Sequence, residues 1–597
     1  MPQPSVAPIM HLLALSCTLT TWLLAFATFL GLGRATARAL RMRFPAHEQP
    51  FSHVWLGWAV SLIFLQLWHL FLPIDWRAGL CLGVPGLVWS APAVRRLWHR
   101  AGRTPRGYAA ISAALLVLAG GWFAARGMLA PTVYDSGLYH FNAIRWLNEH
   151  QIPPGLGNLH GRLAYNQSYF CYPALLNLYP FFNRGHNAAN SLLFFLLLAE
   201  CLLSVLRALR NRRGRAAPGW RQSLPMLFLP LLLFTAATTS LSAPTPDCAG
   251  FLLQIVLFLH LWRLLRRRSS ARGIRSEAGF VILVSAVSVT VKLSNAVYAM
   301  LCATVAVAFA CTALRRSATS RARCLAPVLS VSGFCLLLSL CRSMLLSGYP
   351  LYPLTVARIP VDWAVPLDAA RSEARSIAAW ARNPTRAASE VLDSRAWFAP
   401  WLKRTMKKQA GCAVSYPVLL FGVFTAMLAC AAATAARRGR ARSQCVYLPA
   451  TLPALGGLAY WFVAAPDPRF AGAQFWILAV AAGATLLAYE NGRIAVMPRT
   501  VVVFVGLGLP FLVWFLKHPD ALARVSTAGY QPLPRAELSQ QTTDSGLTLF
   551  VPVVSDQCWD SPLPSTPHFN PHLSLRDTSL SRGFKMVPPR PAPSTKE

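Results

Sequence analysis

Acidic residues are scarce in this chain of 597 residues. Asp and Glu together number 21 against 57 Lys and Arg, and charged residues make up only 13% of the sequence. In a soluble protein the formal charge of +36 would indicate nucleic-acid binding. Here the basic residues lie in short connections between apolar runs of about 20 residues, each long enough to cross a bilayer. The charge therefore indicates membrane topology, and we expect no nucleic-acid partner.

Other features are missing as well. No alternating polarity at about ten-residue spacing dominates, which disfavours a transmembrane β-barrel. No connection on the basic side is long enough for a nucleotide-hydrolysing domain. The cysteines show no metal-ligand spacing, and most lie in apolar runs, where Cys behaves as a small hydrophobic residue. A disulfide between two of Cys171, Cys412 and Cys558, which fall in predicted outer loops, is left open.

The apolar runs predict an all-α polytopic membrane protein with about fourteen transmembrane helices. The first run lacks a basic leading region, so we expect a retained span rather than a signal peptide. We place the spans at 8–33, 53–73, 77–94, 108–130, 188–208, 223–242, 248–265, 277–291, 294–314, 325–346, 415–436, 446–464, 470–489 and 500–517. Arg-rich connections at 34–50, 95–106, 207–221, 263–275, 315–323, 437–442 and 490–499 then share one side. The positive-inside rule makes that side cytoplasmic and puts both termini outside.

This topology divides the chain into three N-terminal spans (1–107), a core (108–346) with a first outer loop (131–187), a large outer loop with interfacial helices (347–414), C-terminal spans (415–517) and an outer tail (518–597). In the first loop, Leu138, Phe141, Ile144 and Leu147 recur every three residues, which predicts a helix lying on a surface. In the tail, 547–554 predicts a strand and 588–593 predicts disorder.

Two acids lie where predicted spans meet the outer face. Asp135, after the fourth span, has the position of a general base that takes a proton from an acceptor hydroxyl. Asp247 is a second acid that could orient the acceptor or tune its partner. The alternative for both is a helix cap. The polar side chains near Asp135 favour a binding role; they are Tyr139, His140, His160 and Arg162.

Basic residues lie at the same depth. Lys292 and Arg342 fall at outer ends of apolar runs, where an unpaired charge is costly and snorkelling is the alternative explanation. With Arg469, after a Pro-Asp-Pro turn that contains Asp467, they would form an anion site at headgroup depth. A lipid phosphate or pyrophosphate is the anion available there. Tyr349 and Tyr352, in Ser347-Gly348-Tyr349-Pro350-Leu351-Tyr352-Pro353, either bind substrate or form an interfacial turn.

This arrangement resembles GT-C type membrane glycosyltransferases over roughly 108–489. The resemblance implies that Asp135 is the acid after the first core helix, that Asp247 is the acid of the second outer loop, and that basic residues hold a polyprenyl-phosphate sugar donor. Ser136 follows Asp135 where several GT-C branches have a second acid, so a divalent metal stays an open alternative and no other cofactor is expected. Tyr134–His140, Gly155–Gly161, Ser347–Pro353 and Gln557–Asp560 also resemble motifs of a family of bacterial multi-pass membrane proteins.

The favoured hypothesis is a glycosyltransferase of the bacterial inner membrane, acting on its outer face. Its partners would be a lipid-linked sugar donor and membrane lipids, and the question of protein partners stays open. A transporter or flippase is the alternative from another class, and it would need polar groups along a path open to both sides. A polysaccharide polymerase or ligase shares the donor and differs only in the acceptor.

Overall fold

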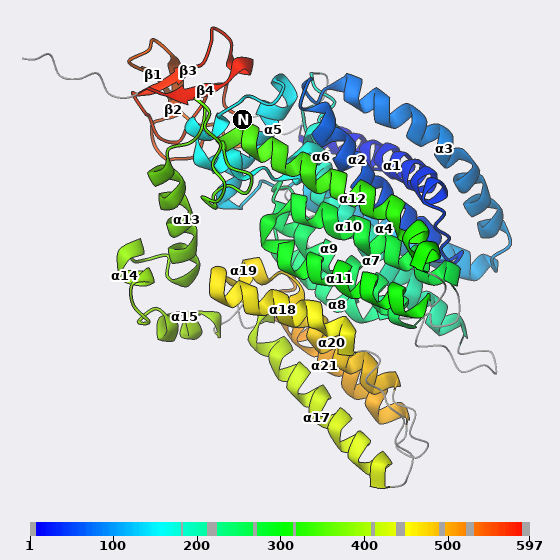
Figure 1. The fold of residues 1–597 in the computed structure, drawn as a ribbon. Helices are drawn as coiled ribbons and strands as arrows, with labels where there is room; N and C mark the ends of the chain where they lie inside the picture. Colours follow the sequence, from blue (N-terminus) through cyan, green and yellow to red (C-terminus); the bar gives the residue numbers. More distant parts are fainter. Residues whose placement is uncertain are drawn as a thin grey trace, which may run out of the picture.

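The computed structural model describes residues 7–180, 183–211, 224–266, 271–314, 318–406, 412–437, 448–488, 496–520 and 531–587, and it is mainly helical (Figure 1). Every predicted span overlaps a helix, and nine of the helices in these ranges are long and apolar enough to cross a membrane. The long helices are α1 (Ala7–Ala39), α2 (Gln49–Trp68), α3 (Trp76–Gly102), α4 (Arg106–Gly127), α7 (Gly185–Asn211), α8 (Leu229–Thr238), α9 (Pro246–Arg266), α10 (Ala271–Val291), α11 (Ala296–Ala313), α12 (Ala318–Ser347), α17 (Ser415–Arg437), α18 (Leu448–Ala464), α20 (Gln474–Ala488) and α21 (Val496–Lys517). They support a multi-pass membrane protein.

Close backbone contact holds the first helices together. A Cβ added to Gly33 of α1 would lie 1.7 Å from the carbonyl oxygen of His53 in α2, and one added to Gly57 of α2 would lie 1.8 Å from that of Phe29 in α1. Small residues let apolar helices approach closely where hydrophobic burial cannot drive association. The two glycines therefore set how α1 packs on α2.

The described arginine-rich connections meet at one end of the bundle, here called the basic end. Arg100 and Arg207 donate to the carbonyl oxygens of Ala46 and His47, at 3.0 and 3.4 Å, and Arg275 donates to that of Arg41 at 2.9 Å. Segments far apart in sequence thus share the face that the charge pattern predicts. Of the other predicted connections, residues 315–317, 438–442 and 490–495 lie outside the described residues, as does 588–593.

A buried charge network lies among the helices near the basic end. The Arg263 Nη2 atom of α9 lies 2.5 Å from Glu200 Oε1 of α7, and Arg263 Nε lies 3.4 Å from Glu48 Oε1. His260 Nδ1 lies 2.7 Å from Glu277 Oε2 of α10. None of these side chains is more than 14% exposed. None of these residues was predicted from the sequence to have a role.

The opposite end, here called the loop end, carries the short elements. They are the π-helix η1 (Ser136–His140), α5 (Phe141–Glu149), η2 (Leu156–Asn158), η3 (Gly161–Tyr165), η4 (Ser168–Phe170), α6 (Cys171–Leu176), η7 (Leu293–Asn295), α13 (Leu367–Arg382), α14 (Ala388–Leu392), α15 (Phe398–Thr405) and α19 (Pro468–Ala471). A further short element, η6 (Leu224–Phe228), leads into α8. The helices α13 to α15 form a group beside α18 and α19 (Figure 1). Arg382 of α13 donates to the Val463 carbonyl oxygen at 2.6 Å, which fixes this group to α18.

The tail forms two small antiparallel hairpins, β1 (Leu538–Thr542) with β2 (Thr548–Pro552), and β3 (Leu573–Leu575) with β4 (Phe584–Met586), with η9 (Leu580–Arg582) between β3 and β4. The strand predicted at 547–554 is confirmed as β2. The tail lies on both outer loops: Thr566 Oγ1 donates to the Leu159 carbonyl oxygen at 2.9 Å, and Arg576 pairs with Asp362 at 2.9 Å. Both loops and the tail therefore share one face.

One expectation needs correction. The predicted surface helix is α5, but Phe141, Ile144 and Leu147 are 4 to 7% exposed, because the helix packs between the tail and α6. The open question of a disulfide is also answered for the predicted outer cysteines. Cys171, Cys412 and Cys558 are all free.

Candidate active site

Asp135 directly precedes the π-helix η1, in the connection that follows α4, and π-helices are often found at functional sites. Its side chain caps no backbone N–H, so the cap alternative is wrong for Asp135. Instead, Arg162 Nη1 donates to Oδ1 and Arg469 Nη1 donates to Oδ2, both at 3.0 Å. The carboxylate is 18% exposed and thus lies between two guanidinium groups at the loop end.

Asp247, in the first turn of α9, forms the second half of the same cluster. Lys292 Nζ donates to Asp247 Oδ1, and Arg469 Nε lies 3.6 Å from Oδ2. Arg469 therefore connects the two predicted acids directly. Burial opposes its charge, yet Asp247 and Asp135 raise the pKa of Arg469, so this bridge is stable as an ion pair.

A third acid closes the cluster on the side of Arg162. Glu373 of α13 lies with Oε1 3.8 Å from Arg162 Nε and accepts a hydrogen bond from the Tyr165 hydroxyl. Burial opposes the charge of Arg162, but Tyr165, Asp135 and Glu373 raise its pKa. We define the ionic cluster as Asp135, Asp247, Glu373, Arg162, Arg469 and Lys292. It holds three acids and three bases, each from a different helix or turn of the chain.

Aromatic rings surround the ionic cluster. The Arg469 guanidinium carbon lies 5.1 Å from the Trp380 ring centroid and 5.0 Å from that of Phe470, and Lys292 Nζ lies 4.7 Å from Phe470. Rings over cations stabilise the charge where water is excluded. Tyr139 is buried, with its ring centroid 6.0 Å from the guanidinium carbon of Arg162. Burial raises the pKa of Tyr139, so its hydroxyl stays protonated.

The sequence comparisons can now be set beside this geometry. The model of a protein family described as "Domain of unknown function (DUF8201)" matches residues 16–476. The chain belongs to the DUF8201 family. No curated protein and no solved structure matched the sequence. The matched range contains the entire ionic cluster, so the cluster lies within the part that this family shares.

Not every predicted site residue joins the ionic cluster of this DUF8201 chain. Arg342 is buried in α12, where it donates to the Gln66 carbonyl oxygen at 3.1 Å and to Asn166 Oδ1 at 3.3 Å. It contacts no carboxylate among the described residues, so it braces the first loop against α2. Tyr349 donates to the Val365 carbonyl oxygen at 3.1 Å, which makes it part of the turn after α12.

The remaining predicted residues lie close to the cluster. Asp467 caps α19 by accepting from the Arg469 N–H at 3.0 Å, and burial raises its pKa. The Tyr352 ring lies 6.4 Å from that of Tyr165, and the His160 ring lies 6.5 Å from that of Tyr139. Burial lowers the pKa of His140 to about 3, so its ring is neutral at pH 7. Its Nδ1 atom has no hydrogen-bond partner among the described residues.

The described residues contain no group of three or more His, Cys, Asp or Glu that could hold a metal ion. Each acid of the ionic cluster is instead paired with a basic side chain. The residues present thus offer no preformed set of ligands for a divalent metal.

Hydrogen bonds join the tail to the turn that carries Asp135. The Gln557 side chain donates to the Tyr134 carbonyl oxygen at 2.9 Å, and the Trp559 N–H donates to that of Gly137 at 2.7 Å. The Tyr134 hydroxyl donates to Asp556. Residues on both sides of Asp135 are therefore bonded to one tail segment, Asp556–Trp559.

Gly137→Ala is expected to weaken the contact between the tail and the Asp135 turn. A Cβ at Gly137 would lie 2.7 Å from Trp559 Cε2, so the indole must shift, at a cost of about 1–3 kcal/mol. We expect the Trp559 amide to exchange its hydrogen roughly 5- to 100-fold faster, since local opening becomes easier by that amount. Hydrogen exchange of the full chain in nanodiscs measures this. Gly121→Ala is the control, because a Cβ there meets nothing within 4 Å; equal exchange in both variants would contradict the contact.

Proposed function

We propose that the chain is a GT-C type membrane glycosyltransferase that moves a sugar from a polyprenyl-phosphate donor to an acceptor hydroxyl. In this proposal the chain spans the bacterial inner membrane about fourteen times, with both termini and the ionic cluster on the periplasmic face. The observation that carries the proposal is the pairing of Asp135 and Asp247 through Arg469 at the ends of apolar helices. Basic groups at headgroup depth suit a lipid phosphate, and an acid beside them suits a base.

The balanced charges of the ionic cluster suggest how the donor would be received. Without ligand, Arg162 and Arg469 neutralise Asp135. A donor phosphate placed among Arg162, Arg469 and Lys292 would compete for these cations, and the Asp135 carboxylate would be released to accept a proton. Binding of the donor would then activate the base.

The proposed chemical step is an inverting displacement. The acceptor oxygen attacks the anomeric carbon and forms the new C–O bond, while its proton passes to Asp135. The bond between the anomeric carbon and the phosphate oxygen breaks, and the electron pair leaves with polyprenyl phosphate. Lys292 and Arg469 stabilise the negative charge that develops on the leaving phosphate.

Transfer by the purified full-length chain in liposomes tests this function. The chain receives decaprenyl-phosphate-linked tritiated hexoses or pentoses and delipidated glycan from Gram-negative cell envelopes. We expect tritium in the glycan and an equal amount of released decaprenyl phosphate. Label that crosses the bilayer while still linked to decaprenyl phosphate would make the protein a flippase. If no donor gives either sugar transfer or movement of the labelled donor across the bilayer, the proposal is contradicted.

A further inference from the structure

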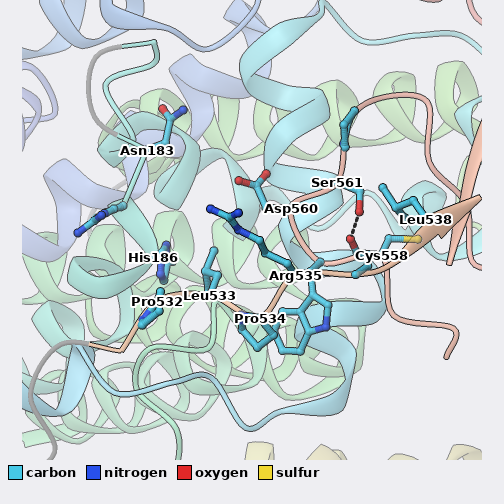
Figure 2. A pocket seen from close by; sticks show the side chains of 14 residues that line it. Asn183, His186, Pro532, Leu533, Pro534, Arg535, Leu538, Cys558, Asp560 and Ser561 are labelled. Atoms are coloured by element: carbon cyan, nitrogen blue, oxygen red, sulfur yellow. Dashed lines mark hydrogen bonds between the residues drawn. The ribbon is translucent and has the colours of Figure 1, made fainter. Parts of the chain in front are cut away.

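Two adjoining hollows open between the tail and the first outer loop, away from the ionic cluster. They have volumes of about 430 and 270 Å³ and share Asn183, His186, Leu533 and Asp560 in their walls. We call the joined hollows the tail groove. Figure 2 shows the larger one, with Arg535 and Asp560 reaching into it from the tail and Asn183 and His186 from the start of α7. Its size is within the range typical of small-molecule sites.

One wall of the tail groove is polar, and its charged side chains are held in place by contacts with one another. Arg145 of α5 pairs with Glu149 at 2.7 Å and donates to the Asp560 carbonyl oxygen at 3.0 Å, with Asp560 Oδ1 at 3.7 Å. These contacts join α5 to the tail and hold the carboxylates of Glu149 and Asp560 at the groove. Carboxylates held in this way accept hydrogen bonds from hydroxyl groups.

Other parts of the lining are flat and apolar. They are ring surfaces contributed by Pro532, Pro534, Pro562, Trp559 and Tyr179. A pyranose has the matching character, because its hydroxyl groups lie at the rim and its C–H groups form flat faces. Rings that alternate with fixed hydrogen-bonding groups therefore suit a chain of sugars better than a purely apolar ligand.

The charges of the tail groove favour an anionic ligand. Three arginines line it, Arg145, Arg184 and Arg535, against the two acids Glu149 and Asp560. Both acids lie against Arg145. Arg535 is exposed and makes no ion pair with the residues that the structure describes. A guanidinium in this setting is suited to a carboxylate of the ligand, which it can bind through two parallel hydrogen bonds.

The tail groove is also connected to the candidate active site. Trp559 lines the groove, and its backbone N–H bonds to Gly137, two residues after Asp135. The segment that forms the groove wall is therefore the one that grips the Asp135 turn.

We propose that the tail groove binds an oligosaccharide that carries carboxylate groups, the acceptor of the transfer described above. The identification as acceptor rests on the proposed function; the binding of the oligosaccharide does not. Arg535 binds a carboxylate of the sugar, and Leu533, which lines both hollows, contacts its apolar face.

Binding to the full-length chain in phosphatidylcholine nanodiscs tests this proposal. The probes are fluorescent oligogalacturonate and a neutral malto-oligosaccharide of the same length. We expect oligogalacturonate to bind more tightly, and Arg535→Ala to weaken it about tenfold through loss of a charged hydrogen bond. Leu533→Trp should block both hollows. Arg582→Ala, an exposed arginine of the same tail outside the groove, should bind like wild type.

The outcomes separate the two proposals. Equal binding of oligogalacturonate by wild type, Arg535→Ala and Leu533→Trp would overturn the groove, since binding would then reflect the basic surface in general. No binding of either probe would overturn it too. Groove-dependent binding without transfer from any lipid-linked donor would support the oligosaccharide site and contradict the glycosyltransferase.

Discussion

Asp135→Asn is expected to lower sugar transfer by about 10²–10⁴-fold and to leave the fold intact. The amide has nearly the shape of the carboxylate and can still accept from one of the two arginines through its single oxygen, but it cannot take the acceptor proton. Both arginines keep a second carboxylate nearby, because Arg162 lies 3.8 Å from Glu373 and Arg469 lies 3.6 Å from Asp247. No cation is therefore left without an acid, and thermal unfolding in nanodiscs should change little.

Two further variants make this expectation sharp. Asp577→Asn, on the exposed part of the tail, is the matched control and should transfer sugar like wild type. Asp247→Asn should lower stability as well as transfer, because Asp247 is the only acid that pairs with Lys292 among the described residues. Full transfer by Asp135→Asn would show that this residue is not the base. Loss of folding in that variant would show that Asp135 serves structure instead.

The long helices could be predicted because their signal is local. An apolar run of membrane length is visible in the sequence, and the Arg-rich connections show which connections lie on the same side of the membrane. Asp135, Asp247, Lys292 and Arg469 were found for the same reason, since charged residues at the ends of apolar runs stand out. Their pairing in one cluster depends on how α9, α19 and the first loop pack, and it was left as a hypothesis.

Other parts of the site carried no such signal. Glu373 lies in a polar stretch of the large outer loop (347–414), and only the packing of α13 brings it to Arg162. The hydrogen bonds between Asp556–Trp559 and the Asp135 turn join residues more than 400 positions apart. Arg342 lies apart from the ionic cluster, and its guanidinium donates to backbone and amide oxygens. A costly charge near a membrane surface thus indicates a partner without indicating which one.

The second large effect is expected at the basic end, far from the ionic cluster. Arg263→Ala should destabilise the chain by about 3–5 kcal/mol, because it removes the cation that pairs with the buried Glu200. Glu200 and Glu48 have side chains only 5% and 14% exposed, and Arg263 lies 2.5 and 3.4 Å from them. Thermal unfolding in nanodiscs measures the loss. Arg272→Ala, at the exposed start of α10 near the same end, is the matched control and should change stability little.

A double variant separates loss of charge balance from loss of packing. Arg263→Met together with Glu200→Gln removes one cation and one anion while keeping comparable volume, so most of the stability should return. If the double variant is as unstable as Arg263→Ala, the network acts mainly through the shape of Arg263. If Arg263→Ala itself unfolds like wild type, the buried acids take up protons at little cost, and the network does not hold the helix ends together. Recovery in the double variant would instead show that α7 and α9 are joined by a charge pair that tolerates removal only as a pair.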